Sequence, residues 1–133
     1  MLSEQANKKS AFGKQLFNRF KLVDIECNDA IKVIQSRDCK NAFFYVDPPY
    51  FNANMGHYKG YTEQQFSDLL ECLGNIKGKF LLSSYPSDVL NNFIQKHNLQ
   101  SIQKNRTIAV NHNARKPKTE CLTANYDILS LVK

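Results

Sequence analysis

One short stretch of the sequence combines a carboxylate, two prolines and an aromatic ring. The stretch is Asp47-Pro48-Pro49-Tyr50, and it directly follows an apolar run at residues 42–46. Such a run predicts a buried parallel strand, whose carboxyl end is where open α/β sheets bind ligands. Proline fixes φ and has no N–H group, so the turn after Asp47 offers carbonyl acceptors with few competing donors. Acceptors beside an aromatic ring favour a planar amine as the ligand.

We call the turn at residues 47–49 the corner. The residues after it predict alternating helices and strands. Thr62 and Gln65 have the spacing of a capping box, and apolar residues then recur at helical spacing as far as residue 73. Residues 79–83 predict the next strand, and a second helix is predicted to start from Ser87. This alternation predicts an α/β fold with a parallel sheet and right-handed crossovers.

The residues before the corner predict smaller elements. A weak apolar stripe within residues 1–19 predicts a short helix, and residues 22–25 predict a short strand. Asp29 then precedes apolar residues at helical spacing, so it is a candidate N-cap that accepts a hydrogen bond from the first turn.

Two polar segments are candidates for substrate contacts. Residues 51–61 predict a loop above the corner, which would either close over a substrate or be a plain surface connection. Near the end, residues 106–110 and 120–124 predict an antiparallel hairpin, because the segment between them leaves no room for a helix. That segment, residues 111–118, is basic, which favours either a phosphate contact or a solvated turn that keeps a sheet edge from aggregating.

Composition limits the broad class of the protein. A chain of 133 residues predicts a single domain, and a net charge of +6 favours polyanionic partners such as nucleic acid. The four cysteines form no C-x-x-C pair and share no ligand spacing with the three histidines, so thiols are predicted rather than a metal site. We expect a cytosolic protein, since no signal-peptide pattern and no apolar run of membrane-spanning length occurs.

The corner and its surroundings resemble the adenine-N6 DNA methyltransferases related to the Dam methylases. Asp47-Pro48-Pro49-Tyr50 resembles their catalytic motif, and further similarities lie at residues 25–29, at Phe51 and Asn52, and at residues 118–126. The resemblance covers residues 10–127 and corresponds to the latter half of such an enzyme.

The resemblance implies a role for each site residue. Asp47, Pro48 and Tyr50 would be catalytic: the Asp47 carboxylate and the Pro48 carbonyl would accept hydrogen bonds from the adenine amine, and Tyr50 would stack on the extruded base. Asp29 and Asp47 would bind the methyl donor S-adenosyl-L-methionine, and no metal would be needed. Substrate contacts would come from the remaining candidates, which are Pro49, Phe51, Asn52, His57, Tyr58, Lys59, Arg115 and Lys116.

The sequence also departs from the family pattern. The donor site of these enzymes is built chiefly on a glycine-rich turn, yet none of the five glycines here belongs to a G-x-G. The resemblance therefore implies a partial Rossmann-like sheet, with residues 20–133 as a catalytic half-domain and residues 1–19 as a remnant of the recognition region. Without two further strands the edge of residues 43–46 would be open, so we expect a homodimer, a complementing N-terminal half, or pairing of residues 22–25 beside that strand.

Three functions follow from these patterns. The first is a DNA adenine-N6 methyltransferase, present as a catalytic part that is weak or inactive alone. The second is a non-catalytic remnant that binds nucleic acid or a partner subunit. The third is a methyltransferase that acts on RNA, although the aspartate before the prolines favours adenine in DNA.

Overall fold

The computed structural model describes residues 13–51, 60–111 and 114–131. Its elements in chain order are α2 (Lys14–Phe20), α3 (Ala30–Arg37), β1 (Phe43–Val46), α4 (Glu63–Gly74), β2 (Lys79–Ser84), α5 (Asp88–His97), β3 (Gln100–Asn111), β4 (Ala114–Ala124) and a 3₁₀ turn, η1 (Leu129–Leu131). The predicted alternation of strands and helices is therefore confirmed. None of the helices in the described ranges is long and apolar enough to span a membrane.

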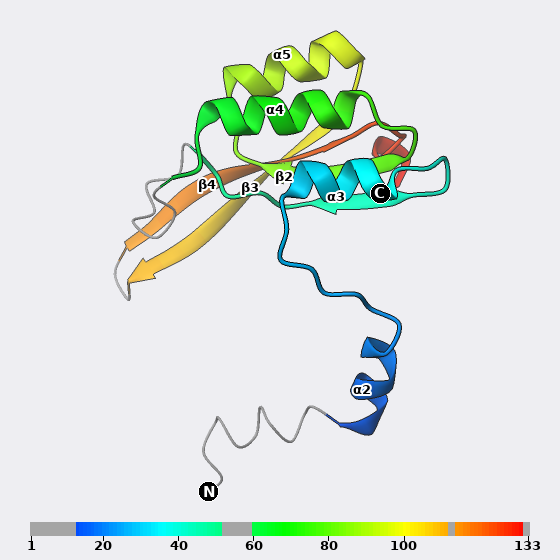
Figure 1. Cartoon of the computed structure of the whole chain (residues 1–133). Coiled ribbons are helices and arrows are strands. Elements are labelled where there is room, and N and C mark those ends of the chain that lie inside the picture. Colours follow the sequence, from blue (N-terminus) through cyan, green and yellow to red (C-terminus); the bar gives the residue numbers. More distant parts are fainter. Residues whose placement is uncertain (1–12, 52–59, 112–113, 132–133) are drawn as a thin grey trace, which may run out of the picture.

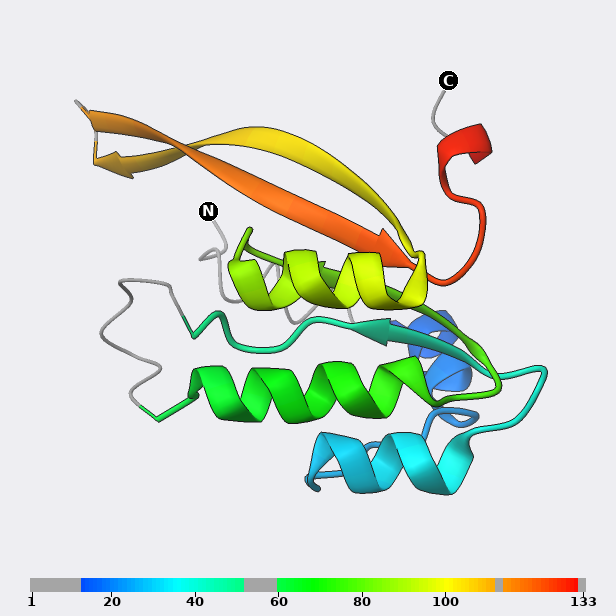
Figure 2. The same ribbon diagram turned by 90° about the horizontal axis from the view of Figure 1, so that it is seen from above.

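The four strands form one mixed sheet in the order β1-β2-β4-β3. β1 and β2 pair in parallel, with α4 as the crossover, whereas β4 runs antiparallel to both of its neighbours. Helices α4 and α5 lie on one face of this sheet, and α3 lies beside α4 near β1 (Figures 1 and 2). The expected α/β class is confirmed, with β1 at one edge of the sheet.

The core lies between β1, β2 and the helices. Alternation along β2 points Phe80 and Leu82 at the helices, and both are fully buried. From β1, Val46 is buried and Phe44 is half-buried against the same cluster. The helices contribute buried apolar residues at helical spacing, which are Ile34, Phe66, Leu69, Leu70, Leu73, Leu90 and Phe93.

Capping residues start α4 and α5 where the sequence predicts. Thr62 Oγ1 accepts a hydrogen bond from the Gln65 N–H at 3.2 Å, and Gln65 Oε1 accepts one from the Thr62 N–H at 2.8 Å. This reciprocal pair is the predicted capping box. Ser87 likewise caps α5 by accepting a hydrogen bond from the Leu90 N–H.

The hairpin is longer than the sequence predicts. β3 and β4 pair from Gln100 opposite Ala124 to Asn111 opposite Ala114, so residues 114–118 belong to a strand rather than to a loop. β2 stops at Ser84, which is opposite Cys121, and the outer part of β4 therefore pairs with β3 alone. Pro117 lies in that part of β4, which has a strand neighbour on one side only, and proline within sheets is confined to such edge positions and bulges. The polar sequence of the hairpin predicted a loop at residues 111–118, because a ribbon that extends beyond the sheet has no apolar strand pattern there (Figure 2).

The strand predicted at residues 22–25 does not form. Leu22 and Ile25 are 93% and 83% exposed, and the segment runs as an extended connection between α2 and α3. The expectation that this segment pairs beside β1 is therefore wrong, since β1 has β2 as its strand neighbour and is an edge. A segment of four residues can form a strand only when a partner strand lies alongside, and local pattern does not specify that partner.

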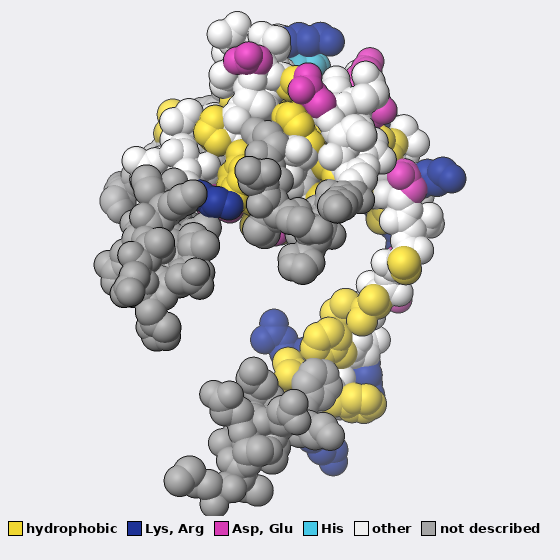
Figure 3. Space-filling view, turned by 90° about the vertical axis from the view of Figure 1, so that its left-hand side faces the viewer, with side chains coloured by type: hydrophobic (Ala, Val, Ile, Leu, Met, Phe, Trp, Pro, Cys, Tyr) yellow, Lys and Arg dark blue, Asp and Glu magenta, His cyan; other side chains and the backbone are white. Residues whose placement is uncertain are grey.

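The short helix predicted within residues 1–19 is present as α2. It stands apart from the sheet in Figure 1, and none of its residues is buried. Apolar side chains line α2 and the segment that follows it, as the yellow atoms in Figure 3 show. We call residues 14–25 the arm.

Candidate active site

A cavity of about 570 Å³ lies at the carboxyl end of β1. Asp47, Pro48 and Pro49 form part of its wall, and α3 and α4 supply the rest. Val33, Ile34, Leu69 and Phe44 are among the apolar lining residues, while the further polar ones include Asp29, Tyr61, Gln65 and Asp68. The structure therefore brings two predicted carboxylates, Asp29 and Asp47, to one hollow at the sheet edge where α/β folds bind ligands.

Asp29 is the N-cap of α3. Its Oδ1 atom accepts a hydrogen bond from the Lys32 N–H at 3.0 Å, and its own N–H donates to Asn28 Oδ1 at 2.9 Å. The predicted capping role is confirmed. Since the side chain also lines the cavity, a contact with a ligand amine is compatible with the cap.

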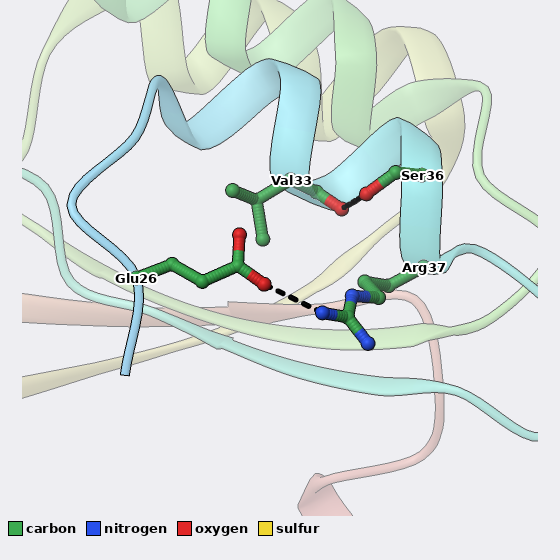
Figure 4. A network of polar contacts seen from close by, with 4 residues as sticks. All are labelled: Glu26, Val33, Ser36 and Arg37. Atoms are coloured by element: carbon green, nitrogen blue, oxygen red, sulfur yellow. Dashed lines mark hydrogen bonds and ion pairs between the residues drawn. The ribbon is translucent and has the colours of Figure 1, made fainter. Parts of the chain in front are cut away.

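An ion pair fixes the chain just before this cap. Glu26, in the connection that follows the arm, accepts a hydrogen bond from the Arg37 guanidinium in the last turn of α3. Figure 4 shows the two side chains pointing toward one another beneath α3. The hydrogen bond and the charge of Glu26 raise the pKa of Arg37. Both groups are exposed, so the pair orients the approach to Asp29 rather than adding much stability.

Tyr50 lies beside the corner but outside the cavity wall. Its ring packs against the Tyr85 ring, with centroids 4.1 Å apart and planes tilted by 36°. Its hydroxyl group donates toward Asp47 Oδ1 at 3.4 Å, so phenol and carboxylate are linked, although only the carboxylate lines the hollow.

Two residues that the sequence reasoning did not single out hold the Tyr50 hydroxyl. Ser83 Oγ lies 3.0 Å from it, and Glu120 Oε1 accepts a hydrogen bond from it at 3.1 Å. The Ser83 hydroxyl in turn donates to Glu120 Oε1 at 2.8 Å. Glu120 lies within residues 118–126, which resemble the family pattern, whereas only the register that pairs Val46 with Leu82 brings Ser83 to Asp47 and Tyr50.

The surroundings of the Tyr50 hydroxyl raise its pKa, so it stays protonated well above the pH at which a free tyrosine ionises. Burial is the largest cause that raises the pKa of Tyr50, to about 12, and the nearby charges of Asp47 and Glu120 act in the same direction. The hydrogen bond with Ser83 opposes them. Tyr50 is therefore a hydrogen-bond donor toward its carboxylate neighbours.

Phe51 anchors the chain beyond the corner in the core. Its ring lies 5.3 Å from the Phe66 ring, measured between centroids, and both line a small aromatic crevice with Tyr50, Tyr85 and Ser84. The Ser84 hydroxyl in this crevice is buried and has no hydrogen-bond partner in the part of the chain that the structure describes.

Several predicted site residues lie outside the described residues. These are Asn52, His57, Tyr58 and Lys59, which include the loop expected to close over the substrate. Arg115 and Lys116 lie in β4, where their backbones pair with Ala109 and Ile108.

Comparison with family models shows which protein family the chain belongs to. A family model described as D12 class N6 adenine-specific DNA methyltransferase matches residues 3–108, which is more than half of the chain and includes the corner. The chain belongs to this family. The match ends before residues 118–126, so their likeness to the family pattern stays a resemblance. No match was found among curated proteins or solved structures.

Membership of the D12 class implies S-adenosyl-L-methionine as the cofactor. The cavity fits part of such a molecule, because Asp29 and Asp47 supply acceptors for amine groups while Val33, Ile34 and Leu69 supply apolar walls. Its volume lies within the range of cofactor pockets. Among the residues that the structure describes, no group of three His, Cys, Asp or Glu side chains is placed to hold a metal ion.

Proposed function

We propose that the Asp47 corner binds the exocyclic amine of an adenine in DNA and prepares it for methylation at N6. The observation that supports this most directly is that Asp47, Pro48 and Pro49 line the cavity at the carboxyl end of β1. Membership of the D12 class supports adenine in DNA as the substrate.

The chemistry follows from the electronic structure of the amine. The lone pair of the amine is delocalised into the purine ring, which makes the nitrogen a poor nucleophile. Hydrogen bonds from the amine to the Asp47 carboxylate and the Pro48 carbonyl favour tetrahedral geometry and localise the pair. When bound, S-adenosyl-L-methionine supplies a methyl group on a sulfonium centre. Positioning then dominates, since effective molarities of about 10⁵ to 10⁸ M are known for well-oriented groups.

Asp29 and Tyr50 have supporting roles in this proposal. Asp29 would accept a hydrogen bond from the adenine amine of the cofactor while it caps α3. Tyr50 would stack on the extruded base through the ring face turned away from Tyr85. Such stacking is worth roughly 1–3 kcal/mol per base.

The remaining contacts would come from the segments on either side of the corner. Pro49 and Phe51 would shape the base pocket together with Asn52, and the loop residues His57, Tyr58 and Lys59 would cover it. Arg115 and Lys116 would meet DNA phosphates from the hairpin, since phosphate contacts fix the orientation of a protein on DNA.

We propose that this chain alone binds the cofactor weakly and methylates little. Its sequence contains no G-x-G, the core of the family's donor site. Residues 20–133 would act as a catalytic half-domain, with residues 1–19 as a remnant of the recognition region. The open edge of β1 favours a partner strand from a second copy or from a complementing N-terminal half. The missing G-x-G and the open edge of β1 also support the alternative of a non-catalytic remnant that binds nucleic acid or a partner.

Methyl transfer from radiolabelled S-adenosyl-L-methionine to DNA that lacks N6-methyladenine tests the proposal. We expect little incorporation by the chain alone, more when a separately expressed N-terminal half of a D12 enzyme is added, and none with Asp47→Ala in the same mixture. Parallel cofactor titrations should show weak binding that the added half strengthens.

Each contrary outcome identifies a different error. Robust incorporation by the chain alone would contradict the incomplete donor site. Incorporation that Asp47→Ala leaves intact would contradict the proposed site. No incorporation with any added half would favour the non-catalytic alternative, and transfer to RNA rather than DNA would favour the third function.

A further inference from the structure

The Tyr50 hydroxyl lies where the carboxyl ends of β1 and β2 come close to the middle of β4. It meets Asp47 after β1, Ser83 near the end of β2 and Glu120 on β4. We propose that Glu120 is a positioning residue for the active site, acting through the Tyr50 hydroxyl on the ring and on Asp47. This inference rests on the proposed function of the corner.

Glu120 and Ser83 approach from the sheet face opposite the helices. Side chains alternate along a strand, and the adjacent Ser84 and Cys121 are buried, with Cys121 in the core cluster beneath the helices. Asp47 instead lines the cavity that α3 and α4 enclose. The Tyr50 hydroxyl therefore connects the Glu120 carboxylate, on the sheet face opposite the helices, to the Asp47 carboxylate, which lines the cavity.

The contacts fix Tyr50 in two independent ways. Its hydroxyl is held by hydrogen bonds with Ser83 and Glu120, and one face of its ring is covered by Tyr85. Ser83 also donates to Glu120, so the three groups form a triangle with sides of 2.8–3.1 Å in which two hydroxyl protons are shared. A ring held at its tip and on one face keeps the other face in a fixed orientation for a base.

The charge of Glu120 has a directional effect. A phenol has one proton to donate, and Asp47 Oδ1 and Glu120 Oε1 are its two possible carboxylate acceptors. The contact with Glu120 is shorter, 3.1 Å against 3.4 Å, so Glu120 draws the donor toward itself. This leaves the Asp47 carboxylate free to accept from a substrate amine.

The neighbouring charged and titratable groups support this assignment. Lys118, two residues before Glu120 on β4, donates from Nζ to the Tyr85 hydroxyl at 3.1 Å and lies 5.2 Å from the Tyr85 ring centroid. Two side chains of β4 thus hold the Tyr50–Tyr85 pair: Glu120 bonds to Tyr50, and Lys118 bonds to Tyr85.

Glu120→Gln tests the inference, because it keeps the shape of the side chain but removes its charge. The chain is labelled with ¹³C in its tyrosine rings, and Tyr50→Phe identifies the Tyr50 signal among the six tyrosines. We expect Glu120→Gln to move the Tyr50 ring signals, whereas Glu71→Gln, the same change on an exposed part of α4, leaves them in place. Ser83→Ala is the second variant, since it removes another side of the triangle.

Binding of 2′-deoxyadenosine is then followed by NMR titration. Glu120→Gln should weaken binding roughly three- to ten-fold, less than the loss of a direct hydrogen bond to a charged group, because Glu120 acts on the ligand only through Tyr50. In a chain that also carries Tyr50→Phe, the same substitution should change affinity less than two-fold, because its effect passes through the hydroxyl. A role confined to stability would leave the affinity of the folded protein unchanged.

Two results would overturn the positioning role. One is a set of Tyr50 signals unmoved by Glu120→Gln, and the other is a loss of affinity of equal size with and without Tyr50→Phe. Failure of the unsubstituted chain to bind 2′-deoxyadenosine would instead contradict the proposed function, whereas the ring signals test the link between Glu120 and Tyr50 without any ligand.

Discussion

The hydroxyl groups of Ser83 and Ser84 lie on opposite faces of β2. The Ser83 hydroxyl has a hydrogen-bond partner, whereas the Ser84 hydroxyl has none among the described residues. Both side chains are 2% exposed. A buried hydroxyl without a partner costs about 1–3 kcal/mol in desolvation. Ser83, by contrast, donates to Glu120 at 2.8 Å.

These adjacent serines give a matched pair of stability predictions. Ser84→Ala should increase the free energy of unfolding by roughly 1 kcal/mol, because it removes an unsatisfied polar group. Ser83→Ala should decrease the same quantity by a similar amount, because Glu120 loses a donor. Urea denaturation followed by circular dichroism measures both. The interpretation would be wrong if Ser84→Ala were the more destabilising change.

Substitutions of Asp47 and Asp68 should distinguish the carboxylate that binds the substrate amine from one that only lines the cavity. Asp47→Asn should weaken binding of 2′-deoxyadenosine roughly ten-fold or more, since hydrogen bonds to charged groups contribute about 1.5–3 kcal/mol. Asp68→Asn is the control: it lines the same cavity but already accepts a hydrogen bond from Gln64 at 2.8 Å. We expect its effect to stay within two-fold. Equal losses in the two variants would argue against a special role for Asp47.

The raised pKa of Tyr50 predicts a loss of stability at high pH. In the unfolded chain tyrosine ionises near pH 10, whereas in the folded protein the pKa of Tyr50 is about 12. The folded state therefore binds more protons between these two values, and the free energy of unfolding falls as pH rises from about 10 to 12. Urea midpoints at pH 8, 10 and 11 measure this slope.

Tyr50→Phe is the control for that slope. Burial also raises the pKa of Tyr61, so part of the slope belongs to that residue. We expect the variant to flatten the dependence between pH 10 and 11 without removing it. An identical slope in the variant would show that Tyr50 ionises normally in the folded state.

The open edge of β1 predicts self-association of the chain. Phe43 and Tyr45 in this strand are 55% and 61% exposed, and the arm adds the exposed apolar residues Leu16, Phe17, Phe20, Leu22, Val23 and Ile25. Sedimentation velocity should show a dimer at micromolar concentration. Phe43→Lys should shift the population toward monomer, because a lysine on an edge strand opposes pairing.

Leu129→Lys is the matched control, since Leu129 is 57% exposed in the 3₁₀ turn after the sheet. It should leave the sedimentation coefficient unchanged. A monomer at every concentration tested would show that the edge of β1 does not associate by itself.

The sequence by itself determined the local elements around the site and the chemistry of the corner. Asp29, Thr62 and Ser87 start their helices because their side-chain oxygens accept hydrogen bonds from N–H groups three residues ahead, which local spacing alone specifies. The apolar run before Asp47 likewise had to be a strand that ends in a proline-stiffened turn. The family resemblance carried by those residues agrees with the matched family.

Tertiary structure alone decided which groups meet at that corner and which strands find partners. Glu120 lies 70 positions from Tyr50, yet its carboxylate reaches the phenol because β2 and β4 pair in a particular register. The sequence pattern could not place Tyr85 against Tyr50, nor show that residues 22–25 lack a partner strand. Local hydrogen bonds are encoded within a few residues, whereas strand pairing and packing between strand ends depend on the whole sheet.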